Sequence, residues 1–307
     1  MSIANNRVYR GFTAIFDGNV VNNLGDVRLA ANAQQVKLMA LGDRGIGFEA
    51  TESVAPTVGF STRDAAVMLA LANPTSSVDG LEVGTLAKFQ FQEKGAGVNH
   101  IIASSPRGML LINDFGCNER DQQALVINGT YHCLSDGTNS PLTFNSAGSL
   151  TGVPSAIQGF RLGPVVWQGA VLKGVTNARI QTGFKTSLPP FSQVYPEDLT
   201  VDEFDFSLEL SGTQLEITAG SVLGANYVMG SPIDVYFQRL PNGGIPTDYA
   251  TASHIKVRFN QGTVMFDSPR AQGTGNATMQ MSVRSIDTTN GRALKPVITL
   301  NSTIVLP

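Results

Sequence analysis

The side chains that could do chemistry are few in this chain of 307 residues, and they are widely spaced. The three histidines are His100, His132 and His254, and none stands near a serine, cysteine or carboxylate at the spacing of a known catalytic group. No nucleophile elbow, H-E-x-x-H helix or phosphate-binding loop is present. We therefore expect the histidines to be ordinary surface or loop residues and the protein not to be an enzyme.

Metal and cofactor sites are equally hard to find. The segment 114–121 carries acidic and amide side chains that could hold calcium if the loop closed on itself, but its spacing is not that of an EF-hand, and a solvated loop is the alternative. Cys117 and Cys133 are too few for a structural zinc site. In a reducing compartment they are expected to be free thiols, and in an oxidising one they could pair. No catalytic, cofactor-binding or metal-binding residue is predicted.

Acidic residues gather in one part of the chain. Residues 186–238 contain no lysine or arginine, and Asp202, Glu203, Asp205 and Glu209 lie in a run where apolar and polar residues alternate. This alternation predicts one strand with a wet face. The four carboxylates form a candidate acidic strip, which could be an ordinary solvated face, a surface for a basic partner, or the lining of a passage along which a polyanion slides.

The composition favours strands over helices, because charged residues make up only 15%, glycine is abundant, and β-branched residues recur in short runs. The net charge of −3 argues against tight nucleic-acid binding. The N-terminus lacks the apolar core of a signal peptide, and no apolar run reaches membrane-spanning length. We therefore expect synthesis in a cytoplasm and no membrane anchor.

One stretch of the sequence is written twice. Tyr9–Leu29 and Phe160–Ile180 each hold an apolar run, a glycine turn and a second apolar run, with Gly18 aligned on Gly169. This pattern is typical of a hairpin. Four further matches follow in the same order: Glu52–Phe60 with Asp202–Leu210, Val83–Gln92 with Met229–Gln238, Gly108–Asn113 with Gly262–Asp267, and Pro141–Ser146 with Pro296–Ser302, the last with one extra residue in the later copy. The common order predicts an internal duplication.

The predicted fold is mainly β, with two tandem β-sandwich or barrel domains related by this duplication, at residues 1–152 and 158–307. A linker rich in glycine, proline and serine joins them at Leu150–Gln158. Each domain is expected to carry one helix. The first should open at Ser61 and end before Asn73, and a weaker one is expected at Thr213–Leu223.

The chain resembles a bacteriophage tail tube protein, also called a major tail protein, of the duplicated-domain type. The residues that carry the likeness are the repeated opening hairpin at Phe160–Ile180 and Tyr9–Leu29, the strand-then-helix step at Val58–Ala72, and the closing strands at Ala277–Ser302. The resemblance implies a structural virion protein, located in the tail and made in the bacterial host cytoplasm. It also implies that the chain forms the conduit through which viral DNA is ejected.

The resemblance also implies the partners. Chains would form hexameric rings, or trimeric rings with pseudo-sixfold symmetry, that stack into a tube, contact other tail proteins, and let double-stranded DNA pass without sequence-specific binding. The unaligned regions Asn32–Gly47 and Thr182–Pro196 would be loops or edge strands that contact the next ring, and the acidic strip could line the bore. The alternatives are another virion component (capsid decoration, neck or baseplate), a carbohydrate-binding or adhesive β module, and, as a third class, an enzyme.

Overall fold

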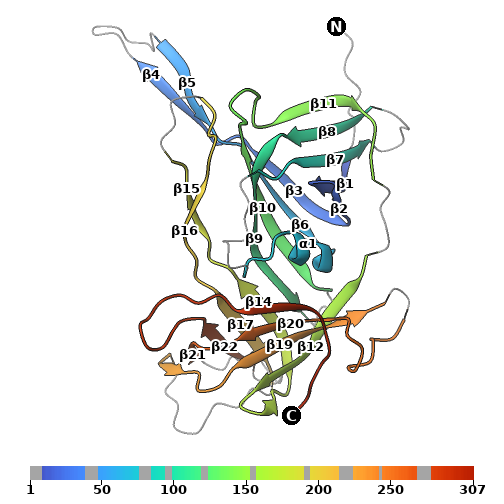
Figure 1. The fold of residues 1–307 in the computed structure, drawn as a ribbon, viewed down its shortest axis with the longest axis vertical. Coiled ribbons are helices and arrows are strands. Elements are labelled where there is room, and N and C mark those ends of the chain that lie inside the picture. The colour runs from blue at the N-terminus through green and yellow to red at the C-terminus, as the bar shows by residue number, and fades with distance from the viewer. Residues whose placement is uncertain are drawn as a thin grey trace.

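The computed structural model describes residues 9–38, 48–75, 84–93, 99–118, 124–152, 157–189, 194–213, 224–241, 244–267 and 278–307. Within these residues it contains twenty-three strands and one helix, so the fold is mainly β, as predicted (Figure 1). The predicted second helix at 213–223 falls almost wholly outside the described residues.

The first half holds the helix and eleven strands. These are β1 (Tyr9–Phe16), β2 (Asn19–Val21), β3 (Leu24–Ala30), β4 (Ala33–Leu38), β5 (Phe48–Val54), β6 (Thr57–Thr62), α1 (Ala65–Leu71), β7 (Ala87–Glu93), β8 (His100–Ser105), β9 (Arg107–Asn118), β10 (Val126–Leu134) and β11 (Thr143–Gly148).

The second half holds the other twelve strands. These are β12 (Gly159–Trp167), β13 (Ala170–Val171), β14 (Val175–Gln181), β15 (Lys185–Ser187), β16 (Thr200–Glu203), β17 (Ser207–Gly212), β18 (Asn226–Val228), β19 (Ile233–Leu240), β20 (His254–Phe259), β21 (Thr263–Phe266), β22 (Met279–Arg284) and β23 (Val297–Ser302).

One nine-stranded sheet runs through both halves, and we call it the shared sheet. Its order is β18-β21-β22-β17-β14-β9-β10-β6-β3, and the halves join where β14 pairs antiparallel with β9. A five-stranded cover sheet packs on each half, with the order β11-β8-β7-β1-β2 in the first and β13-β12-β19-β20-β23 in the second. Two two-stranded hairpins, the first arm (β4 and β5) and the second arm (β15 and β16), leave the sheets (Figure 1).

The two halves have the same strand order. The cover sheets match strand for strand, and β9-β10-β6-β3 of the shared sheet corresponds to β21-β22-β17-β14. The registers agree as well, since Phe16 pairs with Ala87 where Trp167 pairs with Ile233. Descent from a tandem copy remains a prediction, but the arrangement of the strands is repeated.

Left-handed residues recur at the same spacing in both halves. The first hairpin is closed by Asp17 and Gly18, with φ of 46° and 83°, and its counterpart by Gln168 and Gly169, with φ of 52° and 72°. Two-residue turns with positive φ match the twist of the paired strands. Two further pairs repeat the pattern: Asn23 with Gly174, and Asn32 with Gly183.

The apolar core lies between the shared sheet and the cover sheets and is continuous across the predicted domain boundary. Phe16, Phe60, Phe89 and Tyr131 form an aromatic cluster in the first half. At the junction, the ring of Phe115 on β9 lies 6.3 Å from that of Phe237 on the second cover sheet, centroid to centroid. The halves therefore share a sheet and a core.

Two predicted element boundaries need correction. Ser61 and Thr62 do not open the helix, because both still pair with β10, and α1 begins only at Ala65. The single strand expected over 202–210 is two strands, β16 and β17. Between them the Asp205 amide donates to the Thr182 carbonyl, 3.0 Å away, where the chain passes from the second arm to the shared sheet.

The extra residue expected in the closing strand of the second half is also absent. Phe144 pairs with Ala103 and Ile298 with Val257, so β11 and β23 align without an insertion. The orientation of the side chains explains why strand pairing fixes how β11 and β23 align with each other. Shifting a strand by one residue would turn its side chains to the opposite face of the sheet.

Candidate assembly interface

The face of the shared sheet that points away from the core is polar over its central strands, and we call it the polar face. Its side chains come from the positions that alternate with the core residues of each strand. The uncharged members are small hydroxyl and amide residues: Thr57, Ser61, Asn128, Thr130, Asn177, Gln181, Ser207, Ser211, Gln280 and Ser282. The opposite face of the sheet is the apolar core.

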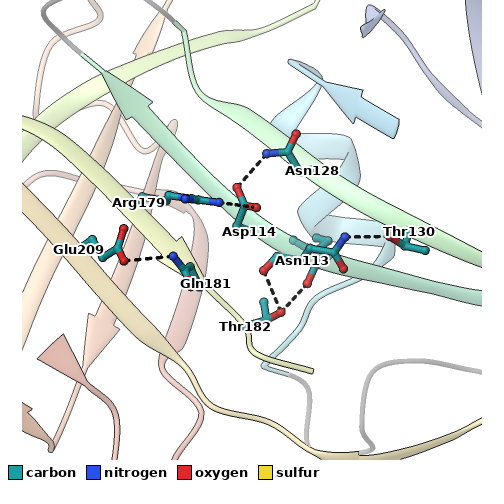
Figure 2. Close-up of polar contacts among 9 residues, drawn as sticks. Asn113, Asp114, Asn128, Thr130, Arg179, Gln181, Thr182 and Glu209 are labelled. Carbon is teal, nitrogen blue, oxygen red and sulfur yellow. Dashed lines mark hydrogen bonds and ion pairs between the residues drawn. The ribbon is translucent and has the colours of Figure 1, made fainter. Parts of the chain in front are cut away.

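The charges at the seam between the halves are paired on this face (Figure 2). Arg179 of β14 reaches across the seam to Asp114 of β9, with Nη2 3.1 Å from Oδ2. Asn128 donates to the other oxygen of Asp114 over 2.8 Å, and Gln181 donates to Glu209 over 3.2 Å. The hydrogen bond to Asp114 raises the pKa of Arg179. The seam is therefore a polar network without a reactive group.

Hydrogen bonds from Thr182 to β9 hold the end of the seam in place. Pairing between β9 and β10 shifts at a bulge that contains Asn113. The buried Thr182 hydroxyl donates toward the carbonyls of Ile112 (2.7 Å) and Asn113 (3.0 Å), and its amide also donates to Asn113 (Figure 2). Gly183 then turns the chain in a left-handed conformation, where a Cβ would lie 2.6 Å from the Asp205 carbonyl oxygen. This turn sends the chain into the second arm.

The second arm lies back over the half with which β14 has just paired. Met109, Leu111, Leu134 and Leu199 form a small buried apolar cluster outside the main core. Leu199 precedes β16, and two further residues of the arm region, Phe184 and Val201, pack against the cluster. Two backbone bonds secure the arm: Ser135 to Pro196 at 2.8 Å and Val54 to Val194 at 2.9 Å. Part of the predicted ring-contact loop Thr182–Pro196 is thus engaged within the chain.

β3 ends the shared sheet, and within the described residues its outer edge has no paired strand. This edge corresponds to the edge of β14 that pairs with β9. Arg28 of β3 stands where Arg179 stands in β14, because Arg28 lies opposite Gly59 of β6 and Arg179 opposite Glu209 of β17. Its side chain is 81% exposed and pairs with Asp26 of its own strand.

The counterpart of Asp114 lies near the other end of the sheet, where the terminal strand β18 pairs with β21. The Asp267 amide donates to the Gln280 carbonyl over 2.9 Å, and Gln280 occupies the place of Asn128, the residue paired with Asp114. Asp267 is exposed, and among the described residues its carboxylate has no ion-pair partner. Near its two ends, the shared sheet therefore carries counterparts of both residues of the Arg179–Asp114 ion pair at the seam.

The four carboxylates of the candidate acidic strip lie on different elements. Asp202 and Glu203 are on β16 of the second arm, where Asp202 accepts a hydrogen bond from Ser187 (3.0 Å) and Glu203 pairs with Lys185. Asp205 lies before β17 and pairs with Arg284 at 2.7 Å. Glu209 is on the polar face beside Arg179. Basic residues from outside the acidic segment thus neutralise part of it, and its role in a lumen remains a prediction.

The expectation that the histidines are surface or loop residues is wrong for His100 and His254. His100 and His254 open β8 and β20 and are buried at equivalent places. Each ring accepts a backbone N–H at Nδ1, from Glu93 at 3.2 Å and Arg239 at 3.0 Å. His132 is half-buried in β10, and burial lowers its pKa. Burial was missed because a single histidine in a strand carries no sequence signal of its partners.

The cysteines are free and buried, on β9 and β10. Burial raises the pKa of Cys117 and of Cys133 to about 12, so neither is a nucleophile at neutral pH. The described residues hold no group of three or more ligating side chains that could bind a metal. Of the calcium candidates, Asp114 belongs to the seam, while residues 119–121 lie outside the described part.

Comparison with known proteins gives no match to any family model and none to any curated protein. Among the described residues, no helix is long and apolar enough to cross a membrane. Sequence comparison of the halves had aligned Arg28 with Arg179, and that alignment was the one available signal for the edge.

Proposed function

We propose that this protein is a structural subunit that assembles head to tail into rings, and that the rings stack into the tail tube of a bacteriophage, the conduit for its DNA. The observation that carries the proposal is the seam. The shared sheet already contains one junction between equivalent halves. At one end β3 repeats the outer edge and the arginine position of β14, and near the other end Asp267, which follows β21 beside the terminal strand β18, repeats the position of Asp114.

Ring closure follows from repeating that junction between chains. β3 of one chain would pair with the next chain beside Asp267, adjacent to the terminal strand β18, as β14 pairs with β9 from Asp114 onward within the chain. Such a head-to-tail contact uses two different surfaces and closes into a ring when the rotation per subunit permits. It would also remove the free edge of β3, which otherwise invites uncontrolled strand pairing. Three chains would give a ring of six equivalent halves, and hexameric rings of whole chains remain the other possibility.

The polar face suits the wall of a conduit for DNA. Tight binding of DNA depends on many unpaired lysines and arginines that contact phosphates. On this face Arg179 is paired with Asp114 and Arg284 with Asp205, and the remaining side chains are mostly hydroxyls and amides. A bore lined in this way would let double-stranded DNA slide without holding it, and the protein would function in the virion tail with other tail proteins at its ends.

An adhesive, sugar-binding role finds less support. Sugar sites of β modules generally use aromatic rings exposed on loops. The single tryptophan, Trp167, is only 8% exposed, and its indole N–H donates to the Met229 carbonyl in the interior.

A charge exchange near the two ends of the shared sheet tests the proposal. Arg28→Asp would bring two carboxylates together at each contact between chains, and Asp267→Arg would bring two guanidinium groups together. Each single variant is expected to assemble less than the wild type, because like charges that face each other across an interface are unfavourable. The double variant restores opposite charges and should assemble again. Light scattering and electron microscopy of the purified full-length protein measure the outcome.

Lys88→Asp is the control, since Lys88 is exposed on β7, the middle strand of the first cover sheet, and lies outside the shared sheet. It should assemble as the wild type does. A wild-type chain that stays solitary at high concentration would refute the proposed function. If both single variants and the double variant form rings as well as the wild type does, this choice of edges would be refuted.

A further inference from the structure

We propose that the first arm of each chain docks on the polar face of the second half of the neighbouring chain, as the second arm docks on the first half within one chain. The inference rests on the proposed head-to-tail assembly and adds a second contact to it. The partner is a second copy of this chain, and the landing site is the polar-face side of β18, β21 and the end of β22.

The two arms are built alike. Lys185 pairs with Glu203 in the second arm, where Gln34 pairs with Ser53 in the first. In both, the register shifts directly after that pair. Each arm follows a sheet strand through one left-handed residue, Gly183 in the second and Asn32 in the first. The hinge and the hairpin are thus repeated.

The surroundings of the two arms differ. The second arm covers the apolar cluster of Met109, Leu111 and Leu134 on the first half. The described part of the first arm is largely exposed, and Ala33 and Thr51, which stand where Phe184 and Val201 stand in the second arm, are both exposed. In Figure 1 the first arm projects away from the sheets. The chain therefore has two similar arms, of which only the second packs on an apolar cluster of the same chain.

The matching landing site on the second half is open. Thr263 and Met265 of β21 stand where Met109 and Leu111 stand in β9. Ile286, just after β22, stands where Leu134 ends β10, and Thr263, Met265 and Ile286 are all half-buried. Val228 of β18 pairs with Thr263, so both point to the same face, and Val228 is 68% exposed. An apolar patch thus remains uncovered at the place where the other half is covered.

Chain connectivity indicates which segment would cover the apolar patch on the second half. The second arm covers the half with which its preceding strand, β14, pairs. The first arm follows β3, whose free edge is proposed to pair with the next chain beside Asp267. The same short hinge would then lay the first arm over β21 of that neighbour. Edge pairing and arm docking would form together, and each ring contact would have a strand pair on one side and an arm across it.

Paired cysteines test the contact in the full-length protein. Thr51→Cys combined with Met265→Cys should form a disulfide between chains, seen as covalent dimers and trimers on a non-reducing gel of assembled rings. Val201→Cys with Leu111→Cys is the internal counterpart and should link within one chain without such a ladder. Thr51→Cys with Thr299→Cys is the negative pair, because Thr299 is exposed on β23 of the second cover sheet, outside the shared sheet. The native cysteines are buried and should not interfere.

The outcomes separate this inference from the proposed function. Rings that form and show the internal link but no 51–265 link would overturn the arm contact alone. Chains that never assemble would overturn both. Adding Arg28→Asp should abolish the 51–265 link, and adding Asp267→Arg as well should restore it. A link that survives Arg28→Asp unchanged would show that the arm docks independently of β3, against the coupling proposed here.

Discussion

Removing the ring of Phe115 is expected to destabilise both halves of the protein together. Phe115 is fully buried on β9, and its ring meets that of Phe237 at a centroid distance of 6.3 Å. Truncation of a buried phenylalanine to alanine costs about 3–5 kcal/mol, because burial is lost and a cavity remains. The aromatic contact contributes about 0.5–1.5 kcal/mol of this loss. Phe115→Ala should therefore lower the free energy of unfolding of the whole chain by about 3–5 kcal/mol.

Urea unfolding with two probes measures the effect. Fluorescence of Trp167, the one tryptophan, reports on the second half, and hydrogen exchange of the β6 and β10 amides reports on the first. Both probes should shift by the same free energy in Phe115→Ala. Phe144→Ala is the control, since Phe144 is 61% exposed, and should change stability by less than about 0.5 kcal/mol. A Trp167 transition that stays in place while the β10 amides lose protection would show two independent cores.

Two further predictions concern single groups. Thr182→Val keeps the shape of the side chain but removes the hydroxyl that bonds the bulge in β9, so urea unfolding should show a loss of about 1–3 kcal/mol, and an unchanged stability would contradict this role of the hydroxyl. The exposed Thr138→Val should change it by less than about 0.5 kcal/mol. Burial lowers the pKa of His132, so the unfolded state takes up a proton more readily; stability should fall as pH drops below about 6.5 and level off below the folded-state pKa. His132→Gln should lose less stability between pH 7.5 and 5.5, and an equal loss would refute this assignment.

Several elements could be read from the sequence because their causes are local. The hairpin turns need left-handed residues, and the aspartate or glutamine before glycine at 17–18 and 168–169 marks them. Alternation identified much of the strand content, and the aligned glycines at 108 and 262 mark a shared constraint. At each glycine, a Cβ would lie within 2.3 Å of a backbone oxygen of the neighbouring strand. Such local constraints require a particular residue type, so they can be recognised in the sequence.

Other features depended on contacts between distant residues. The break between β16 and β17 follows from the Thr182–Asp205 bond, and the start of α1 follows from the pairing of Ser61 and Thr62 with β10. Neither is visible in the local run of residues. The acidic strip was divided in the same way, because Lys185 and Arg284 come from other parts of the chain to pair with it.

By itself, the sequence determined that this chain is built of strands and predicted that strands recur in the same order in its two halves, because turn residues and side-chain alternation depend on local sequence. Only the tertiary structure decided that the halves share one sheet, that one arm is seated while the other is exposed, and that Arg28 and Asp267 stand near opposite ends of that sheet. The physical reason is that strand edges and sheet faces acquire their partners through folding, and no residue type records whether a partner lies within the chain or in a neighbour.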